Sequence, residues 1–161
     1  MAVNQRETGG GAIDHVNRSL LTELQSDGRL SLAELGRRVG LSGPAVAERL
    51  QRLEEEGVIA GYHALVNPRA LGLGLSAVVR IRPNARQLPK VAELARRTPE
   101  VVECHRITGE DCFIMKIYLE ELDALDRVLD RFLAHGQTTT SLIQSSPVPP
   151  RGLPLPGDAR E

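Results

Sequence analysis

The chain has few aromatic residues and few cysteines, and each shortage excludes a class of protein. Its 161 residues include two Tyr, two Phe and no Trp, too few for a surface that stacks single-stranded bases. Two cysteines cannot build a disulfide framework, and there is no charged-then-apolar leader, so we expect a reducing, cytoplasmic location. No apolar run approaches a membrane span. The formal net charge of −1 excludes a polycationic coat.

The sequence also lacks the groupings that catalysis and metal binding need. It shows no carboxylate pair, nucleophile motif or phosphate loop, so we expect no enzymatic activity and no cofactor. Four residues have metal-binding side chains: Cys104, His105, Cys112 and His135. No pair of them has the spacing of a zinc site. In the hairpin expected here Ile107 would oppose Cys112, which leaves Cys104 several residues away along the ladder.

Between Leu30 and Tyr62 the pattern predicts two helices joined by a tight turn. Ser31 is expected to cap the amide of Glu34 while the Glu34 carboxylate reaches back to the Ser31 amide. Gly40 provides the left-handed residue that ends the first helix, and Ser42 caps the second. The apolar stripes that face inward are Leu32, Leu35 and Val39 in the first helix, and Val46, Leu50 and Leu53 in the second.

The second helix keeps small residues and arginines on its open side. A helix-turn-helix places the first turn of its second helix against base edges, while the first helix crosses the DNA backbone. We therefore predict a contact surface for double-stranded DNA made by Ser31, Arg37, Arg38, Ser42, Gly43, Pro44, Ala45, Glu48, Arg49 and Arg52. The alternative is an ordinary helical hairpin with solvated arginines. Since residues 14–62 hold six arginines against eight acidic residues, a basic footprint must be local.

The surrounding segments complete an N-terminal domain and its exit. Residues 1–12 are predicted to be a flexible arm, and Asp14 caps a helix that ends near Gly28 and completes a three-helix domain over residues 13–62. Residues 58–66 favour a strand that leads out of this domain. Residues 63–74 are the expected linker, whose glycines make either a hinge or a plain surface loop.

Residues 75–147 alternate strands and helices in the order βαββαβ. The strands are expected at residues 75–82, 101–108, 112–119 and 138–145, with helices from Leu88 to Thr98 and from Leu122 to Gly136. This order predicts a ferredoxin-like antiparallel sheet with both helices on one face. The fold class is therefore α+β, a helix-turn-helix domain joined by a strand arm to a ferredoxin-like domain. Residues 148–161, rich in proline, are predicted to be a tail.

The order and spacing of a set of residues resemble the helix-turn-helix signature of the Lrp/AsnC (leucine-responsive, feast/famine) transcriptional regulators. They are Gly40-Leu41-Ser42, Val46, Arg49, Arg52-Leu53-Glu54, Gly57-Val58-Ile59 and Gly61-Tyr62. The similarity continues at Thr108-Gly109 and covers roughly residues 13–148. It implies a homodimer that buries the open face of the sheet, assembling further into oligomers such as an octamer. It also implies an effector amino acid held at the turn near residue 109.

Thr108, Gly109, Glu110 and Asp111 are the best candidates for that effector site. A turn at a strand end presents backbone amides to a carboxylate and an acidic side chain to an ammonium group, as an α-amino acid requires. Family members often have Asp three residues after the glycine, where this chain has Cys112. Hairpin turns are also acidic for ordinary reasons, so a plain turn is the alternative.

The leading function is a sequence-specific transcriptional regulator of double-stranded DNA that responds to a small effector, an amino acid. One alternative is a dimeric amino-acid-binding module that regulates an enzyme, because fold does not fix function. Absence of any DNA shift would favour it. The other is an architectural DNA-binding protein indifferent to ligands, which equal affinity for random and promoter DNA would favour.

Overall fold

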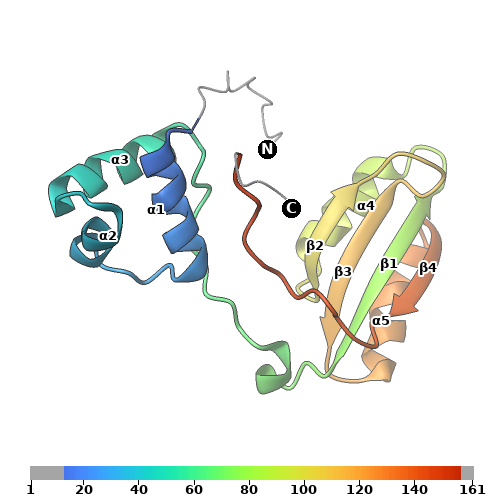
Figure 1. Ribbon diagram of the computed structural model, residues 1–161. Helices are drawn as coiled ribbons and strands as arrows, with labels where there is room; N and C mark the ends of the chain where they lie inside the picture. The colour runs from blue at the N-terminus through green and yellow to red at the C-terminus, as the bar shows by residue number, and fades with distance from the viewer. Residues whose placement is uncertain (1–12, 157–161) are drawn as a thin grey trace. The chain divides into compact units, whose positions relative to one another are not determined.

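The computed structural model describes residues 13–156, and the chain divides into two compact units (Figure 1). The helix-turn-helix domain contains the described residues up to Ala64 together with the segment that starts at Val148. The sheet domain is Leu65–Pro147. The arm predicted for residues 1–12 and the last part of the tail, residues 157–161, lie outside the described residues. The described part of the tail belongs to the helix-turn-helix domain.

Three helices form the first domain: α1 (His15–Ser26), α2 (Leu32–Val39) and α3 (Gly43–Glu55). Asp14 caps α1 as predicted, because its Oδ1 accepts a hydrogen bond from the Asn17 amide at 2.7 Å. The predicted stripes form the core with α1, except that Leu32 is 43% exposed and lies outside it. The buried core residues are Leu20, Leu21, Leu35, Val46, Leu50 and Leu53.

Residues 58–66 do not form the predicted strand. They favour extended backbone, but a strand needs a neighbouring backbone to complete its hydrogen-bonded ladder. No other described segment pairs with them, and Leu65 is 81% exposed. The chain then makes a 3-10 turn (Pro68–Leu71) that ends at Gly72, whose φ is 81°.

The sheet domain has the predicted βαββαβ order. Its elements are β1 (Leu75–Pro83), α4 (Leu88–Arg97), β2 (Val101–Arg106), β3 (Phe113–Leu119), α5 (Leu122–Leu133) and β4 (Gly136–Leu142). The strand order is β2-β3-β1-β4 and all pairs are antiparallel. β4 starts earlier than expected, at Gly136. A Cβ there would lie 2.4 Å from the Arg82 carbonyl oxygen, so only glycine fits opposite the end of β1.

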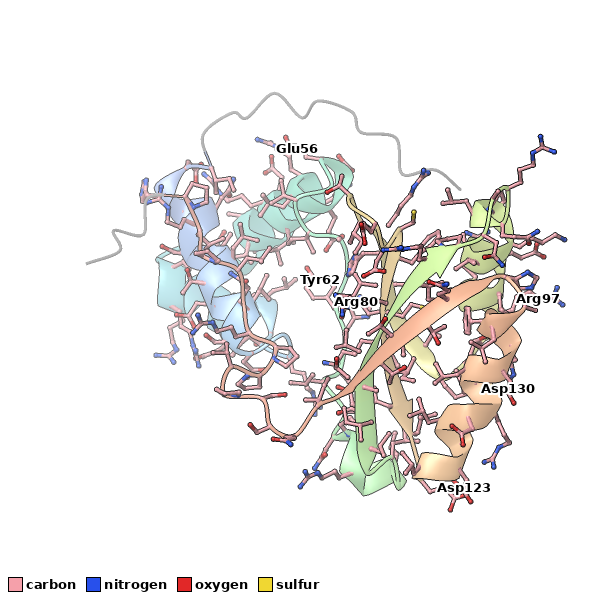
Figure 2. All side chains as sticks on the ribbon, turned by 90° about the vertical axis from the view of Figure 1, so that its right-hand side faces the viewer. Glu56, Tyr62, Arg80, Arg97, Asp123 and Asp130 are labelled. Carbon is pink, nitrogen blue, oxygen red and sulfur yellow. The ribbon has the colours of Figure 1, made fainter. Side chains whose placement is uncertain are left out.

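Strand alternation separates the two faces of this sheet. Ala77, Val79 and Ile81 are fully buried under the helices, which lie on one face of the sheet (Figure 1). Val78, opposite Lys116, stands on the other face, and Figure 2 shows Arg80 on the side of the sheet away from α4 and α5. The domain's own helices leave this face open. No helix described between residues 13 and 156 is both long and apolar enough to cross a membrane.

Candidate nucleic-acid interface and effector turn

Two glycines set the close packing of α2 against the turn that leads to α3. Gly40 ends α2 with φ 73°, as predicted, a backbone region that glycine enters without steric penalty. Gly36 is buried within α2, and a Cβ on it would lie 2.4 Å from the Leu41 carbonyl oxygen. Sequence reasoning missed Gly36, because a glycine inside a helical pattern indicates only a lower helix propensity. The turn thus lies directly on the α2 backbone and fixes where α3 starts.

Serine side chains cap both helices of the motif. The Ser31 hydroxyl accepts a hydrogen bond from the Glu34 amide at 3.2 Å, and the Ser42 hydroxyl accepts one from the Ala45 amide at 3.4 Å. Beyond Ser42, the first turn of α3 carries Gly43, Pro44 and Ala45, whose side chains are small or absent. Ser42 and Pro44 are exposed, so this end of α3 is open to a large ligand such as DNA.

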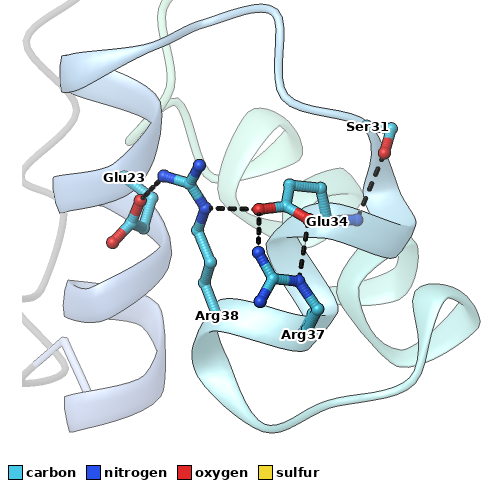
Figure 3. Close-up of polar contacts among 5 residues, drawn as sticks. All are labelled: Glu23, Ser31, Glu34, Arg37 and Arg38. Carbon is cyan, nitrogen blue, oxygen red and sulfur yellow. Dashed lines mark hydrogen bonds and ion pairs between the residues drawn. The ribbon is translucent and has the colours of Figure 1, made fainter.

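The Glu34 carboxylate holds two arginines of α2 (Figure 3). It accepts bonds from Arg37 Nε at 2.9 Å, Arg37 Nη2 at 2.6 Å and Arg38 Nε at 2.8 Å. Arg38 Nη1 also donates to Glu23 of α1 at 2.7 Å. These bonds replace the hydrogen bond that the sequence predicted between the Glu34 carboxylate and the Ser31 amide. Hydrogen bonds from Arg37 and then Arg38 lower the pKa of Glu34 to about 2.

Arg49 does not point to the open side of α3, where it was expected. Its Nη1 donates to Asp14 Oδ2 at 2.7 Å and to Asn17 Oδ1 at 2.9 Å, and its side chain is only 33% exposed. The Asn17 amide and then the Arg49 guanidinium lower the pKa of the Asp14 carboxyl. Because Asp14 and Asn17 at the start of α1 provide hydrogen-bond acceptors, the Arg49 guanidinium turns toward them and joins α3 to α1.

Glu48 and Arg52 remain on the exposed side of α3. Arg52 Nη2 lies 3.1 Å from Glu48 Oε1, one helical turn away, and both side chains are well exposed. Each of the four arginines predicted to contact DNA therefore has a carboxylate partner within its own domain. A phosphate that binds one of these guanidinium groups must either share it with the carboxylate or replace the carboxylate.

The turn after β2 is held at the end of the sheet by backbone bonds. The Ile107 amide donates to the Cys112 carbonyl at 2.9 Å, the opposition expected from the sequence, and the Cys112 amide donates to Ile81 at 2.9 Å. Gly109 has φ 109°, which favours glycine. Thr108, Gly109 and Glu110 are exposed, and Asp111 is partly buried.

Both acids of this turn are paired with arginines of β1. Arg80 Nη1 lies 3.5 Å from Asp111 Oδ2, and Arg82 bonds to Glu110. Sequence reasoning missed both arginines, although their alternation with the buried residues of β1 already placed them on the open face. The turn thus presents charges of both signs, where the sequence suggested acids alone.

The cysteines lie apart on the ladder. Cys104 in β2 opposes Met115 of β3, and Cys112 comes directly before β3; both are free thiols. Burial raises the pKa of the Cys104 thiol, so its thiolate is disfavoured. Within residues 13–156, no three His, Cys, Asp or Glu side chains gather where they could hold a metal ion.

Two family models match this chain. Residues 13–54 match the AsnC-type helix-turn-helix domain, and residues 76–153 match the Lrp/AsnC ligand binding domain. The second match includes the start of the tail. Together the two models cover both domains described above.

Known proteins resemble the chain over most of its length. An uncharacterized helix-turn-helix regulator of Bacillus subtilis, YezC, is 37% identical over 83% of this chain and 95% of its own. The leucine-responsive regulatory protein of Escherichia coli K12 is 37% identical over 81% of this chain and 82% of its own. A transcriptional regulator of Neisseria meningitidis, solved with L-methionine, superposes with a TM-score of 0.81 at 30% identity, covering 88% of this chain and 96% of that one.

Proposed function

The chain belongs to the Lrp/AsnC family of transcriptional regulators, and it joins a DNA-binding helix-turn-helix domain to a ligand-binding domain. From this premise we propose which residues read DNA and which sense the ligand. The observation that carries the DNA assignment is the exposed, narrow first turn of α3, fixed by Gly36 and Gly40. A narrow helix end approaches base edges closely in the major groove.

In this proposal Ser42, Gly43, Pro44 and Ala45 face the base edges of double-stranded DNA. Glu48 lies one turn further along α3 and Arg52 two turns further, and Arg52 binds a phosphate after leaving Glu48. Ser31, Arg37 and Arg38 belong to α2, which crosses the backbone in motifs of this kind. The exposed guanidinium of Arg37 is the more accessible of the pair, since Arg38 is also tied to Glu23.

Arg49 has a different part in the proposal. Its guanidinium holds α3 against the start of α1 through Asp14 and Asn17, so it positions the recognition helix. Both bonds use Nη1, so a direct contact with DNA either uses the other guanidinium nitrogens or requires Nη1 to release both acceptors.

We propose an α-amino acid as the effector, bound at Thr108, Gly109, Glu110 and Asp111. The support is the mixture of charges at this turn: acids that suit an ammonium group, and Arg80 and Arg82 that suit a carboxylate. A zwitterion can satisfy both by entering between the paired side chains. The complex of the Neisseria relative with L-methionine names one compound of this class.

The proposal includes a homodimer formed through the open sheet face, with further assembly up to an octamer. That face includes the apolar residue Val78, which lies opposite Lys116 of β3 and two residues from Arg80 along β1. A two-fold dimer would read two half-sites about 10 bp apart or a multiple of this. The relatives are transcriptional regulators, which supports the proposal that this protein binds DNA in the cytoplasm and has no catalytic activity.

Selection of binding sites from a random DNA pool tests the DNA assignment. Gly43→Gln should weaken binding to the selected site, because its side chain enters the groove edge while no protein atom lies within 4 Å of a Cβ there. Glu56→Gln, beyond the end of α3, is the matched control. Equal affinity for selected and random DNA would contradict sequence-specific reading.

Calorimetry with the common α-amino acids, followed by DNA titration with and without any that bind, tests the effector assignment. Asp111→Ala should abolish the response to the amino acid and preserve effector-free DNA binding. Asp126→Ala, on the exposed side of α5, is the control. An Asp111 variant that responds as the wild type does would place the effector elsewhere.

A further inference from the structure

The C-terminal segment makes a specific contact with α1. The side-chain amide of Gln25 pairs with both backbone groups of Leu153: its Nε2 donates to the Leu153 carbonyl at 3.2 Å, and its Oε1 accepts from the Leu153 amide. Two residues 128 positions apart are thus joined by the donor and acceptor pattern that one peptide group offers another. This pattern recognises backbone, so it does not depend on the Leu153 side chain, which is 77% exposed.

Packing supports the same contact. A Cβ on Gly152 would lie 2.6 Å from Gln25 Oε1, so the absence of a side chain lets the segment approach α1. Leu155 is partly buried and packs against the apolar core of the helix-turn-helix domain. In a polyproline-like backbone, favoured here by Pro154 and Pro156, residues three apart share a face. Gly152 and Leu155 therefore both face the domain while Leu153 faces away.

The connection behind this segment is short. β4 ends at Leu142, and the Ile143 amide still bonds to the Ser76 carbonyl of β1 at 2.9 Å. Only residues 144–147 separate that bond from the part of the chain that belongs to the helix-turn-helix domain. The other connection, residues 65–74, enters the sheet at β1, the neighbour of β4. The two domains are joined by two chain segments that leave adjacent strands.

We propose that the face of α1 around Gln25 is a docking site for the chain's own C-terminal segment, residues 148–156. With this segment docked, two chain segments connect the domains. A change in the sheet domain then reaches α1 through β4 as well as through residues 65–74. The docking stands by itself. Its part in the effector response rests on the function proposed above.

Limited trypsin digestion of the full-length protein tests the docking, because the Arg151–Gly152 bond lies within the segment. A docked segment must open before cleavage, and the cleavage rate then follows the population of the open form. Gln25→Ala removes both side-chain bonds and should speed cleavage by about tenfold. Leu155→Asp should speed it further, and Leu153→Asp, which changes an exposed side chain only, should match the wild type.

Mass spectrometry identifies the cleavage after Arg151, and circular dichroism at 222 nm shows whether each variant keeps its helices. Gln25→Ala remains informative if Leu155→Asp unfolds the domain, since it leaves the core intact. Equal cleavage rates for wild type and Gln25→Ala, both as fast as a free peptide of residues 143–161, would refute the docking.

DNA titration with and without L-methionine or L-leucine tests the coupling. The wild type and Leu153→Asp should change affinity alike, and Gln25→Ala should lose at least half of the change while keeping its effector-free affinity. A Gln25 variant with the full response refutes the coupling and leaves the docking standing. A wild type without any response refutes the coupling together with the proposed effector, while the trypsin rates still decide the docking.

Discussion

Replacing Gly36 with Ala tests whether the contact between the turn and α2 determines the stability of the helix-turn-helix domain. In a helix without neighbours the change would help, because alanine has a helix propensity about 1 kcal/mol better than glycine. Here the new Cβ would lie 2.4 Å from the Leu41 carbonyl oxygen and 3.4 Å from the Ser42 carbonyl carbon. These are backbone atoms, so no side-chain rotation can relieve the collision.

The collision sets the size of the effect. Overpacking a well-filled interior costs about 1 to 3 kcal/mol, and contact with rigid backbone belongs at the upper end. Subtracting the gain in propensity leaves a destabilisation of about 2 kcal/mol. For a domain of this size, each kcal/mol lowers Tm by about 4 to 8 °C, which gives a fall of roughly 8 to 16 °C.

Hydrogen exchange read by mass spectrometry, together with calorimetry of the full chain, resolves this domain from the other one. The α2 and α3 amides of the Gly36→Ala protein should exchange faster, and those of the sheet domain should not change. Gly43→Ala is the control, since nothing lies within 4 Å of its Cβ, and its stability should equal or slightly exceed the wild type. Equal stability of Gly36→Ala and wild type would refute the close-contact argument.

Four further substitutions separate the roles of charged and apolar residues. The pKa of Glu34 falls from 4.5 to about 2 on folding, so its stabilisation is complete above pH 4.5 and is lost as the pH falls toward 2. Glu34→Gln should reduce the acid dependence of the urea midpoint and leave the share of groups such as Asp14, whose pKa is also lowered. Arg49→Ala should lower both domain stability and DNA affinity, whereas Arg52→Ala should lower only DNA affinity and reduce the salt slope by about 1. Val78→Lys should yield a monomer by light scattering, because a dimer would bury a further positive charge beside Lys116 and Arg80.

Each of these has an outcome that would contradict it. A Glu34→Gln protein that still loses stability below pH 4.5 as the wild type does would show that other carboxyls cause the loss. Identical melting of the Arg49 and Arg52 variants would remove the positioning role of Arg49. Leu122→Lys, on the exposed side of α5, should stay dimeric, and loss of the dimer in both sheet-domain variants would mean that the substitution acts through folding.

The sequence predicts what local rules determine. Ser31, Ser42 and Asp14 occupy caps, whose chemistry depends on three neighbouring residues, and the predicted stripes of α3 and β1 became core because one periodicity holds throughout each element. The order of elements in the sheet domain follows from the same patterns. The strand expected at residues 58–66 was wrong for a physical reason: its ladder needs a second backbone that residues 13–156 do not provide.

Most of the features that the sequence did not reveal are long-range. Gln25 meets a residue 128 positions away, and nothing local marks its amide as a backbone receptor. Arg49 looked like an open-face residue by helical spacing, but acceptors on α1 drew its side chain inward. The arginines beside the turn at residues 108–111 come from a strand 28 and more residues earlier. Pairing between elements decides such contacts, and periodicity describes only one element at a time.

The pairing of every candidate arginine with a carboxylate has a consequence for how DNA is chosen. A phosphate that replaces Glu34 or Glu48 gains the same kind of charge-assisted bond that the arginine gives up. The released carboxylate then faces the DNA backbone and repels it. In the proposed interface, contacts with phosphate therefore add less net affinity than unpaired arginines would add, which weakens binding to DNA of arbitrary sequence. We propose that the narrow first turn of α3 provides the difference in affinity between selected and arbitrary DNA, because no carboxylate of the described residues competes for its fit to base edges.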